Sequence, residues 1–136
     1  MVYVKEFEIT TTDKNSLHNI TDVVEKTINE SGIKNGVVVV ETLHSTAGIL
    51  MIASYGKEIL DDVIREMRRT IPSRINFYHQ QAPENAAGHV KSSLFGTSVS
   101  AIVKDAKLLC TNKKDIYFAD YDGPQNRKYS ICVIGE

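Results

Sequence analysis

The segment Phe77–Lys91, FYHQQAPENAAGHVK, separates two parts of the chain that differ in pattern. An amphipathic helical pattern precedes it, and a run of short strand patterns follows it. The segment carries two of the four histidines, His79 and His89. Binding and catalytic groups are concentrated in loops held by a rigid scaffold. A third histidine, His44, ends the apolar run VVVVETLH, and we expect the three imidazoles to meet in one polar site.

The composition is that of one soluble globular domain covering residues 1–136. Its formal net charge of −1 argues against nucleic-acid binding driven by bulk electrostatics. No apolar run approaches the roughly 18 residues that a membrane-spanning helix needs. The first residues, MVYVKEFEI, alternate and carry acids, unlike a signal peptide. We therefore expect a cytoplasmic protein that binds neither nucleic acid nor membrane.

Three amphipathic patterns predict helices. In the first, apolar residues recur on one helical stripe, and Gly32 is suited to end the helix in a left-handed conformation. His18 lies off that stripe, and we expect it to be a solvated surface residue. Asn85 is a suitable N-cap for the third helix. The predicted helices are Ser16–Ser31, Lys57–Arg69 and Ala86–Leu94.

Strand patterns occupy most of the remaining sequence. Val2–Thr11 alternates, with Tyr3, Phe7 and Ile9 on one face. Val37–Val40 is a run of β-branched residues, typical of a strand buried on both faces. Further strands are predicted at Ile49–Ala53, Thr97–Val103, Lys107–Cys110, Ile116–Asp122 and Lys128–Ile134. Because short turns join consecutive strands, we predict an α+β fold with two to three helices on one face of a mainly antiparallel sheet.

The two cysteines, Cys110 and Cys132, are far apart in the sequence and form no CxxC motif. Free cysteine is among the residues most often buried, so we interpret both as reduced, buried thiols in strands. A disulfide bond or a role as metal ligands remains an alternative.

Three neutral imidazoles can hold a zinc ion tetrahedrally and leave one position open for water or substrate. Glu84 and Asn85 lie near enough in the sequence to orient the ring nitrogens of His79 and His89. The spacing itself is not specific, because there is no HExxH motif and the three histidines come from separate elements. Both a zinc site and three hydrogen-bonded histidines therefore stay open.

Anion binding is a second possibility, since Lys91 and several serines surround the third predicted helix. The serines lie within or after that helix, however, which equally fits a glycine cap followed by a hydroxyl-rich strand. Arg127 follows the turn DGPQN and would bind an anion only if it points inward. Nucleophilic catalysis has little support, because no GxSxG motif is present.

The order of these pieces is similar to that of a known family. HSTAG after a strand, YH, ENAAGHVKSSLFGTS and DGP followed by arginine together resemble the secondary thiamine-phosphate synthase family, also called YjbQ-like or UPF0047. The strongest part is Asn85–Ser98, which resembles the family pattern N-A-D-A-H-[IL]-K-x-S-L-[LM]-G-x-S. His44 matches the histidine of H-T-[TS]-A-x-L, His79 that of Y-x-H, and Arg127 the second arginine of D-G-P-R-x-R.

This resemblance implies an α+β sandwich that assembles as a homotrimer and has a pocket lined by histidines. It implies bound divalent metal, with zinc as the first candidate, or bound anions in some members. It also implies, for some members, a weak thiamine-phosphate synthase activity, which joins a pyrimidine diphosphate to a thiazole phosphate and releases pyrophosphate. By matching position, His44, His79 and His89 would be metal ligands or catalytic groups. The phosphate-binding residues would be Lys91, Arg127 and Asn85.

The sequence departs from the family pattern at several polar positions. The family's Asn-Glu pair is Ile52–Ala53, its acid within N-A-D-A-H is Ala87, its Trp-Gln is Lys113–Lys114, and its first arginine after D-G-P is Gln125. These losses remove candidates for a general base. Two hypotheses follow: a transferase acting on phosphorylated small molecules, or a non-catalytic trimeric protein that binds a metal or an anion.

Overall fold

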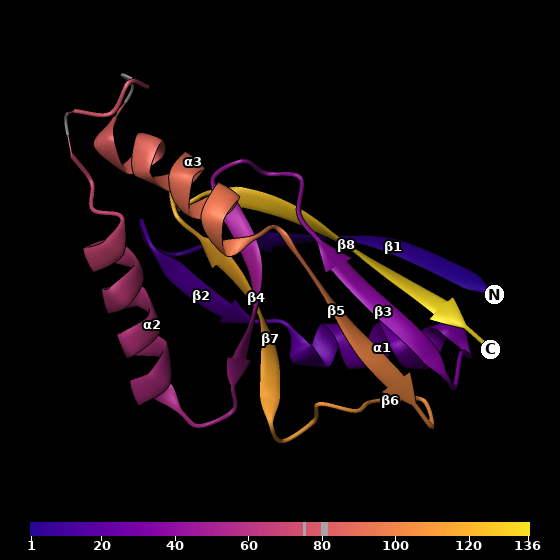
Figure 1. The fold of residues 1–136 in the computed structure, drawn as a ribbon. Helices are drawn as coiled ribbons and strands as arrows, with labels where there is room; N and C mark the ends of the chain where they lie inside the picture. Colours follow the sequence, from indigo (N-terminus) through magenta and orange to yellow (C-terminus); the bar gives the residue numbers. More distant parts are fainter. Residues whose placement is uncertain (75, 80–81) are drawn as a thin grey trace.

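The computed structural model describes residues 1–74, 76–79 and 82–136. Within these ranges, three helices and two antiparallel sheets form an α+β fold, which confirms the predicted class (Figure 1). The strands form two separate sheets, whereas the sequence predicted a single sheet. The five-stranded sheet has the order β1 (Val2–Thr10), β8 (Asn126–Gly135), β3 (Gly36–Glu41), β5 (Ser98–Lys104) and β6 (Lys107–Leu108). The three-stranded sheet has the order β2 (Ser16–Asn19), β7 (Lys114–Asp120) and β4 (Ala47–Ala53).

The core lies between the two sheets and is completed by helix α1 (Thr21–Ser31). Its apolar side chains come from both sheets and the helix, including Val24, Val40, Ile49, Phe118 and Ile131. Helices α2 (Lys57–Thr70) and α3 (Pro83–Phe95) lie on the side of the three-stranded sheet, against β2 and β4 respectively (Figure 1). The helices therefore do not share one face of one sheet.

The five-stranded sheet is buried on one face only. Tyr3, Phe7 and Ile9 pack against the core, as their alternation predicted. In β3, Val40 is fully buried whereas Val37 is 40% exposed, so the expectation of a strand buried on both faces was wrong. Antiparallel sheets can leave one face uncovered, and nothing among the described residues covers the outer face of this one.

The predicted helix Ser16–Ser31 is a strand followed by a shorter helix. The first residues form β2, because Leu17 pairs with Ala119 and the backbone completes the edge of β7. Helix α1 begins at Thr21, whose amide donates to the Asn19 side chain over 3.0 Å. Tertiary pairing thus outweighs helical periodicity. Gly32 does end the helix, with φ at 72°.

This change moves His18 from a solvated helix face to a strand. The side chain is half-buried, and its Nε2 lies 2.9 Å from Ser16 Oγ. Burial lowers the pKa of His18, since removing the ring from water disfavours the imidazolium form. The expected surface histidine is therefore part of the packed structure.

Helix α2 matches its prediction closely, while α3 begins earlier than predicted. Pro83 occupies the first turn of α3, where its fixed φ and missing N–H are tolerated. Asn85 consequently lies inside the helix and is not the N-cap. Cys110 and Cys132 are free thiols and are half-buried, less than expected. No helix in the described ranges is both long and apolar enough to cross a membrane.

The substitution Phe118→Ala tests the packing between the sheets. The ring is fully buried and lies 5.8 Å, centroid to centroid, from the ring of Tyr129 on the opposing sheet. Truncation should lower the free energy of unfolding by about 3–5 kcal/mol, measured by urea denaturation. Tyr55→Ala is the control because Tyr55 is 81% exposed. Equal losses in both variants would contradict this description of the core.

Candidate functional site

An ion pair between Asp120, the last residue of β7, and Arg127, near the start of β8, links the two sheets. The two side chains are 0% and 4% exposed. Arg127 donates to the carboxylate through Nε over 3.0 Å and through one terminal nitrogen over 2.7 Å. The same terminal nitrogen donates to Thr46 Oγ1 over 2.8 Å. This two-pronged geometry neutralises the guanidinium charge within the chain.

Asp120 accepts further hydrogen bonds that complete the pair. Thr11 Oγ1 donates to its carboxylate over 2.6 Å, and the Asp122 amide donates over 2.9 Å. Burial alone would raise the pKa of Asp120, but the hydrogen bonds from Arg127 and Thr11 outweigh it, and the pKa is lowered. The carboxylate therefore stays ionised and keeps Arg127 in place.

His44 follows β3, and hydrogen-bond donors face both of its ring nitrogens. The Lys128 amide donates to Nε2 over 3.0 Å, and the second terminal nitrogen of Arg127 lies 3.3 Å from Nδ1. A neutral imidazole has one acceptor nitrogen, and the Lys128 amide occupies it. Burial, together with the charge of Arg127, lowers the pKa of His44. In this geometry His44 is a neutral ring with no lone pair available to a metal ion.

His44 and His89 line one cleft of about 420 Å³ between the β3–β4 loop and the last turns of α3. The remaining lining residues are mostly small or hydroxyl-bearing: Thr42, Leu43, Ser45, Ser92, Ser93, Gly96 and Thr97. Ser92 Oγ donates to the Ala47 carbonyl and Ser93 Oγ to the His89 carbonyl, which fixes both hydroxyls. Among the described residues, the lining contains no carboxylate.

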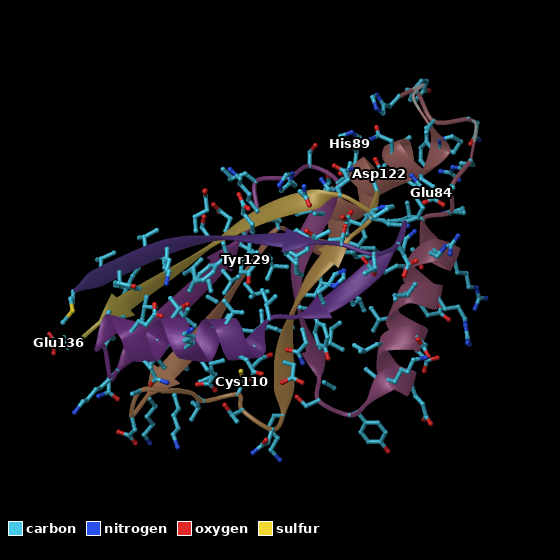
Figure 2. All side chains as sticks on the ribbon, turned by 180° about the vertical axis from the view of Figure 1, so that it is seen from behind. Glu84, His89, Cys110, Asp122, Tyr129 and Glu136 are labelled. Atoms are coloured by element: carbon cyan, nitrogen blue, oxygen red, sulfur yellow. The ribbon has the colours of Figure 1, made fainter. Side chains whose placement is uncertain are left out.

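His79 joins this group through His89. Their rings meet edge to face with centroids 5.0 Å apart. His79 Nε2 lies 2.9 Å from Asn85 Oδ1, and the amide nitrogen of Asn85 donates to Asp122 over 2.8 Å. Figure 2 shows His89, Asp122 and Glu84 gathered at the same end of the molecule. Asn85 thus ties the segment before α3 to the β7–β8 turn.

Lys91 does not line the cleft. Its side chain is 1% exposed, and its ammonium donates to Asn15 Oδ1 over 2.7 Å. Burial lowers the pKa of Lys91, although nearby Glu84 opposes the shift. Asn15 also contacts Glu84 over 3.4 Å, so Lys91 holds α3 to the loop between β1 and β2. A lysine so placed supports the site and does not reach a ligand in the cleft.

The structure therefore brings the three histidines and Arg127 into one region, while Lys91 lies apart from the cleft. No three His, Cys, Asp or Glu side chains in residues 1–74, 76–79 and 82–136 are placed to hold one metal ion. The arrangement of these side chains does not fit the predicted zinc ion held by His44, His79 and His89.

Sequence reasoning missed Asp120, on which the site depends. A signal for it is present: the acid interrupts the apolar strand pattern IYFADY. A carboxylate buried in an apolar strand requires a cationic partner, and Arg127 is the nearest basic residue after the turn. Thr11 and Thr46 carry no comparable signal.

Comparison with known proteins identifies relatives across the whole chain. Residues 5–136 match the family model described as UPF0047 protein YjbQ-like. A UPF0047 protein of Methanocaldococcus jannaschii is 34% identical over 131 residues, covering 96% of this chain and 94% of the relative. The UPF0047 protein YugU of Bacillus subtilis is 30% identical over 132 residues, covering 97% and 99%.

Solved structures agree in fold. A YjbQ/UPF0047 family protein from Clostridium acetobutylicum superposes with a TM-score of 0.89 at 30% identity, covering 96% of this chain and 99% of that chain. A protein of unknown function from Sulfolobus solfataricus, described as YbjQ-like, superposes with a TM-score of 0.94 at 26% identity, covering 100% and 99%.

Replacing Asp120 by Asn should destabilise the protein strongly, because it leaves the Arg127 charge buried without a counter-ion. Breaking a buried ion pair from one side costs about 3–5 kcal/mol in the free energy of unfolding. Urea denaturation measures this loss. The control is Asp61→Asn in the exposed Lys57–Asp61 pair, which should change stability by about 0.5 kcal/mol or less. A loss below about 1 kcal/mol for Asp120→Asn would show that the ion pair is dispensable.

His44 should make stability depend on pH. Its pKa is lowered on folding, so the unfolded chain takes up a proton at higher pH than the folded chain does. The neutral ring of His44 contributes to the free energy of unfolding above about pH 6.5, the pKa of histidine in the unfolded chain. This contribution is lost as the pH falls through the lower pKa of His44 in the folded chain. His44→Gln should therefore lose less stability than the wild type when pH falls from about 7.5 to about 5, measured by urea denaturation. Identical losses in the two proteins would contradict the neutral ring.

Proposed function

Because the chain belongs to the UPF0047 (YjbQ-like) family, we propose that it binds the phosphate group of a small phosphorylated molecule in the cleft between His44 and His89. The observation that carries this proposal is the lining of the cleft. Two imidazoles and several hydroxyls converge there, and no carboxylate is found among the described lining residues. Such a lining supplies hydrogen-bond donors to an anion without repelling it.

Each side chain would have a distinct part in binding. The ring of His89 would donate a hydrogen bond to a phosphate oxygen. The hydroxyls of Ser45, in the β3–β4 loop, and Thr97, just after α3, would add donors. The charge of Arg127 is largely neutralised by Asp120, so Arg127 would act indirectly, by lowering the pKa of His44 and by holding Thr46. The C-terminal end of α3 carries a negative partial charge and does not attract an anion. The attraction would therefore come mainly from the imidazoles.

For the chemical step, we propose a transferase reaction of thiamine-phosphate synthase type. The thiazole nitrogen would form a bond to the methylene carbon of a pyrimidine diphosphate, while the bond from that carbon to pyrophosphate breaks. In this proposal His89 would give a proton to the departing pyrophosphate, while His79, which meets its ring edge to face, would support it. No step depends on zinc, since the three imidazoles do not form a ligand set.

A non-catalytic homotrimer that binds an anion or a metal is the alternative. Three positions at which the family carries polar groups are apolar in this chain: Ile52 and Ala87 are buried, and Ala53 ends β4. They offer neither a general base nor an acid. Release of pyrophosphate from a pyrimidine diphosphate and a thiazole phosphate would favour the transferase, while binding without release would favour this alternative.

Calorimetric titration with pyrophosphate tests the binding proposal. His89→Ala should weaken binding by about tenfold or more, because a hydrogen bond to a charged group is worth about 1.5–3 kcal/mol. His44→Ala should weaken binding less, because both nitrogens of His44 face groups of the protein and the ring forms a wall of the cleft. His79→Ala should have a smaller effect, since His79 acts through His89.

The matched control is His18→Ala, the one histidine whose side chain packs on β2 away from the cleft. Its affinity for pyrophosphate should equal that of the wild type. Unchanged affinity in the His44 and His89 variants would refute the cleft as the site. A parallel titration with zinc, lost in all three variants of His44, His79 and His89, would instead support a metal centre.

A further inference from the structure

The core between the two sheets opens to the surface on one side of the molecule. There β4, an end strand of the three-stranded sheet, faces β5, which has only the two-residue strand β6 beyond it. Met51, Ala101 and Cys110 pack against the core but are only partly buried, so the core is accessible at this opening. A pocket of about 260 Å³ lies there, which we call the edge pocket. Its lining residues are Met51, Ala101, Ile102, Leu109, Cys110, Lys113 and Lys114.

Much of the lining of the edge pocket is apolar. Met51 and Ala101 belong to the two facing strands, while Ile102 and Leu109 are each 58% exposed. The backbone joins the last two residues, because the Leu109 amide donates to the Ile102 carbonyl over 2.9 Å. Exposed apolar side chains gathered in a concave surface are typical of sites that bind the apolar part of a ligand. The edge pocket therefore has an apolar wall that the sheets hold in place.

Two lysines add positive charge to the same pocket. The amides of Lys113 and Lys114 both donate to the Cys110 carbonyl, over 2.9 and 3.0 Å, so a tight turn holds the lysines beside Cys110. Both lysines are exposed, and neither takes part in an ion pair among residues 1–74, 76–79 and 82–136. The described lining contains no carboxylate. The edge pocket thus combines an apolar wall with two ammonium groups.

Two carboxylates lie near Cys110 but outside the lining. Burial raises the pKa of the Cys110 thiol, and the charges of Glu25 and Asp115 add to the increase. Glu25 accepts a hydrogen bond from the Thr111 hydroxyl over 3.0 Å, and Asp115 accepts one from the Asn19 side-chain amide over 3.4 Å. Neither carboxylate lines the pocket. An anionic group within the pocket would therefore meet the ammonium groups with no carboxylate in contact with it.

The same surface includes two places where the sequence departs from the family pattern. Lys113–Lys114 stands where the family has Trp-Gln, and Ile52–Ala53 stands where it has Asn-Glu. These pairs are far apart in the sequence but adjacent in the structure. Ala53 pairs with Lys114, and the Ser54 amide donates to the Lys113 carbonyl over 2.9 Å. An acid is thus lost and two cations are gained in one place, which changes the charge of ligand that this surface favours.

We propose that the edge pocket binds a small molecule that has an apolar chain and one carboxylate. The chain would lie against Met51, Ala101 and Leu109, and the carboxylate would contact the ammonium groups of Lys113 and Lys114. Charge complementarity supports this choice, because a lysine ammonium attracts an anion as a point charge. The volume of about 260 Å³ suits a ligand with a short chain. The edge pocket shares no lining residue with the histidine cleft, so the inference does not depend on phosphate binding there.

Calorimetric titration with octanoate at low salt tests this inference. Octanoate should bind about tenfold or more tightly than acetate, which lacks the chain, and than octanol, which lacks the charge. Lys113→Gln with Lys114→Gln should weaken octanoate binding by about tenfold or more, because the charge-assisted contacts are lost. Lys104→Gln with Lys107→Gln is the matched control, since both lysines lie outside the lining and the net charge changes equally. Its affinity for octanoate should equal that of the wild type.

The Cys110 thiol gives a second measurement at the pocket itself. Cys132→Ser leaves Cys110 as the single thiol of the chain, and octanoate should slow its reaction with a thiol-specific reagent by covering it. Saturating pyrophosphate should leave the affinity for octanoate unchanged. Failure of octanoate to bind the wild type, unchanged affinity in the Lys113 and Lys114 double variant, or an unchanged rate of thiol reaction would each overturn the edge pocket as a site. Displacement of octanoate by pyrophosphate would place the carboxylate in the histidine cleft and overturn it as well.

Discussion

The buried ion pair between Asp120 and Arg127 joins the two sheets at the end of the molecule where the histidines gather. Asp120 ends β7 of the small sheet and Arg127 lies near the start of β8 of the large one. Thr11 and Thr46 bind the same two side chains, so the loops after β1 and β3 are fixed to the same point. Removing two charges from water is costly, and only a fully hydrogen-bonded arrangement offsets that cost. The pair therefore constrains the β3–β4 loop, which forms one wall of the cleft.

The chemistry proposed for the cleft follows from this constraint. The Lys128 amide fixes the ring of His44 at Nε2, and burial together with the charge of Arg127 lowers its pKa, which makes His44 a poor metal ligand and a rigid wall. His89 lies across the cleft on α3, the helix that Lys91 and Asn85 hold in place. The site thus combines one fixed neutral imidazole with one imidazole free to bind a ligand. Such a pair suits a phosphate group better than a zinc ion.

The periodicity of apolar residues correctly predicted β1, α2 and the strands after Gly96, where the apolar side of each element is the side that packs in the fold. It failed where distant segments decide the structure. Ser16–Asn19 has a helical pattern but completes the edge of β7, and Val37 has a buried pattern but faces outward. The histidines were singled out because His44, His79 and His89 match the histidines of motifs that resemble the family pattern. Asp120 was missed although it interrupts the apolar pattern IYFADY, because only the fold shows that its strand end is buried against Arg127.

The central claim is that His44 is a fixed neutral ring and that a phosphate group binds between it and His89. Two-dimensional nitrogen NMR of the imidazole rings tests both parts in one titration with pyrophosphate. We expect the His44 ring to remain neutral with its proton on Nδ1, while the nitrogen signals of His89 shift as ligand is added. A His44 ring that is protonated at neutral pH, or His89 signals that do not move, would contradict the account.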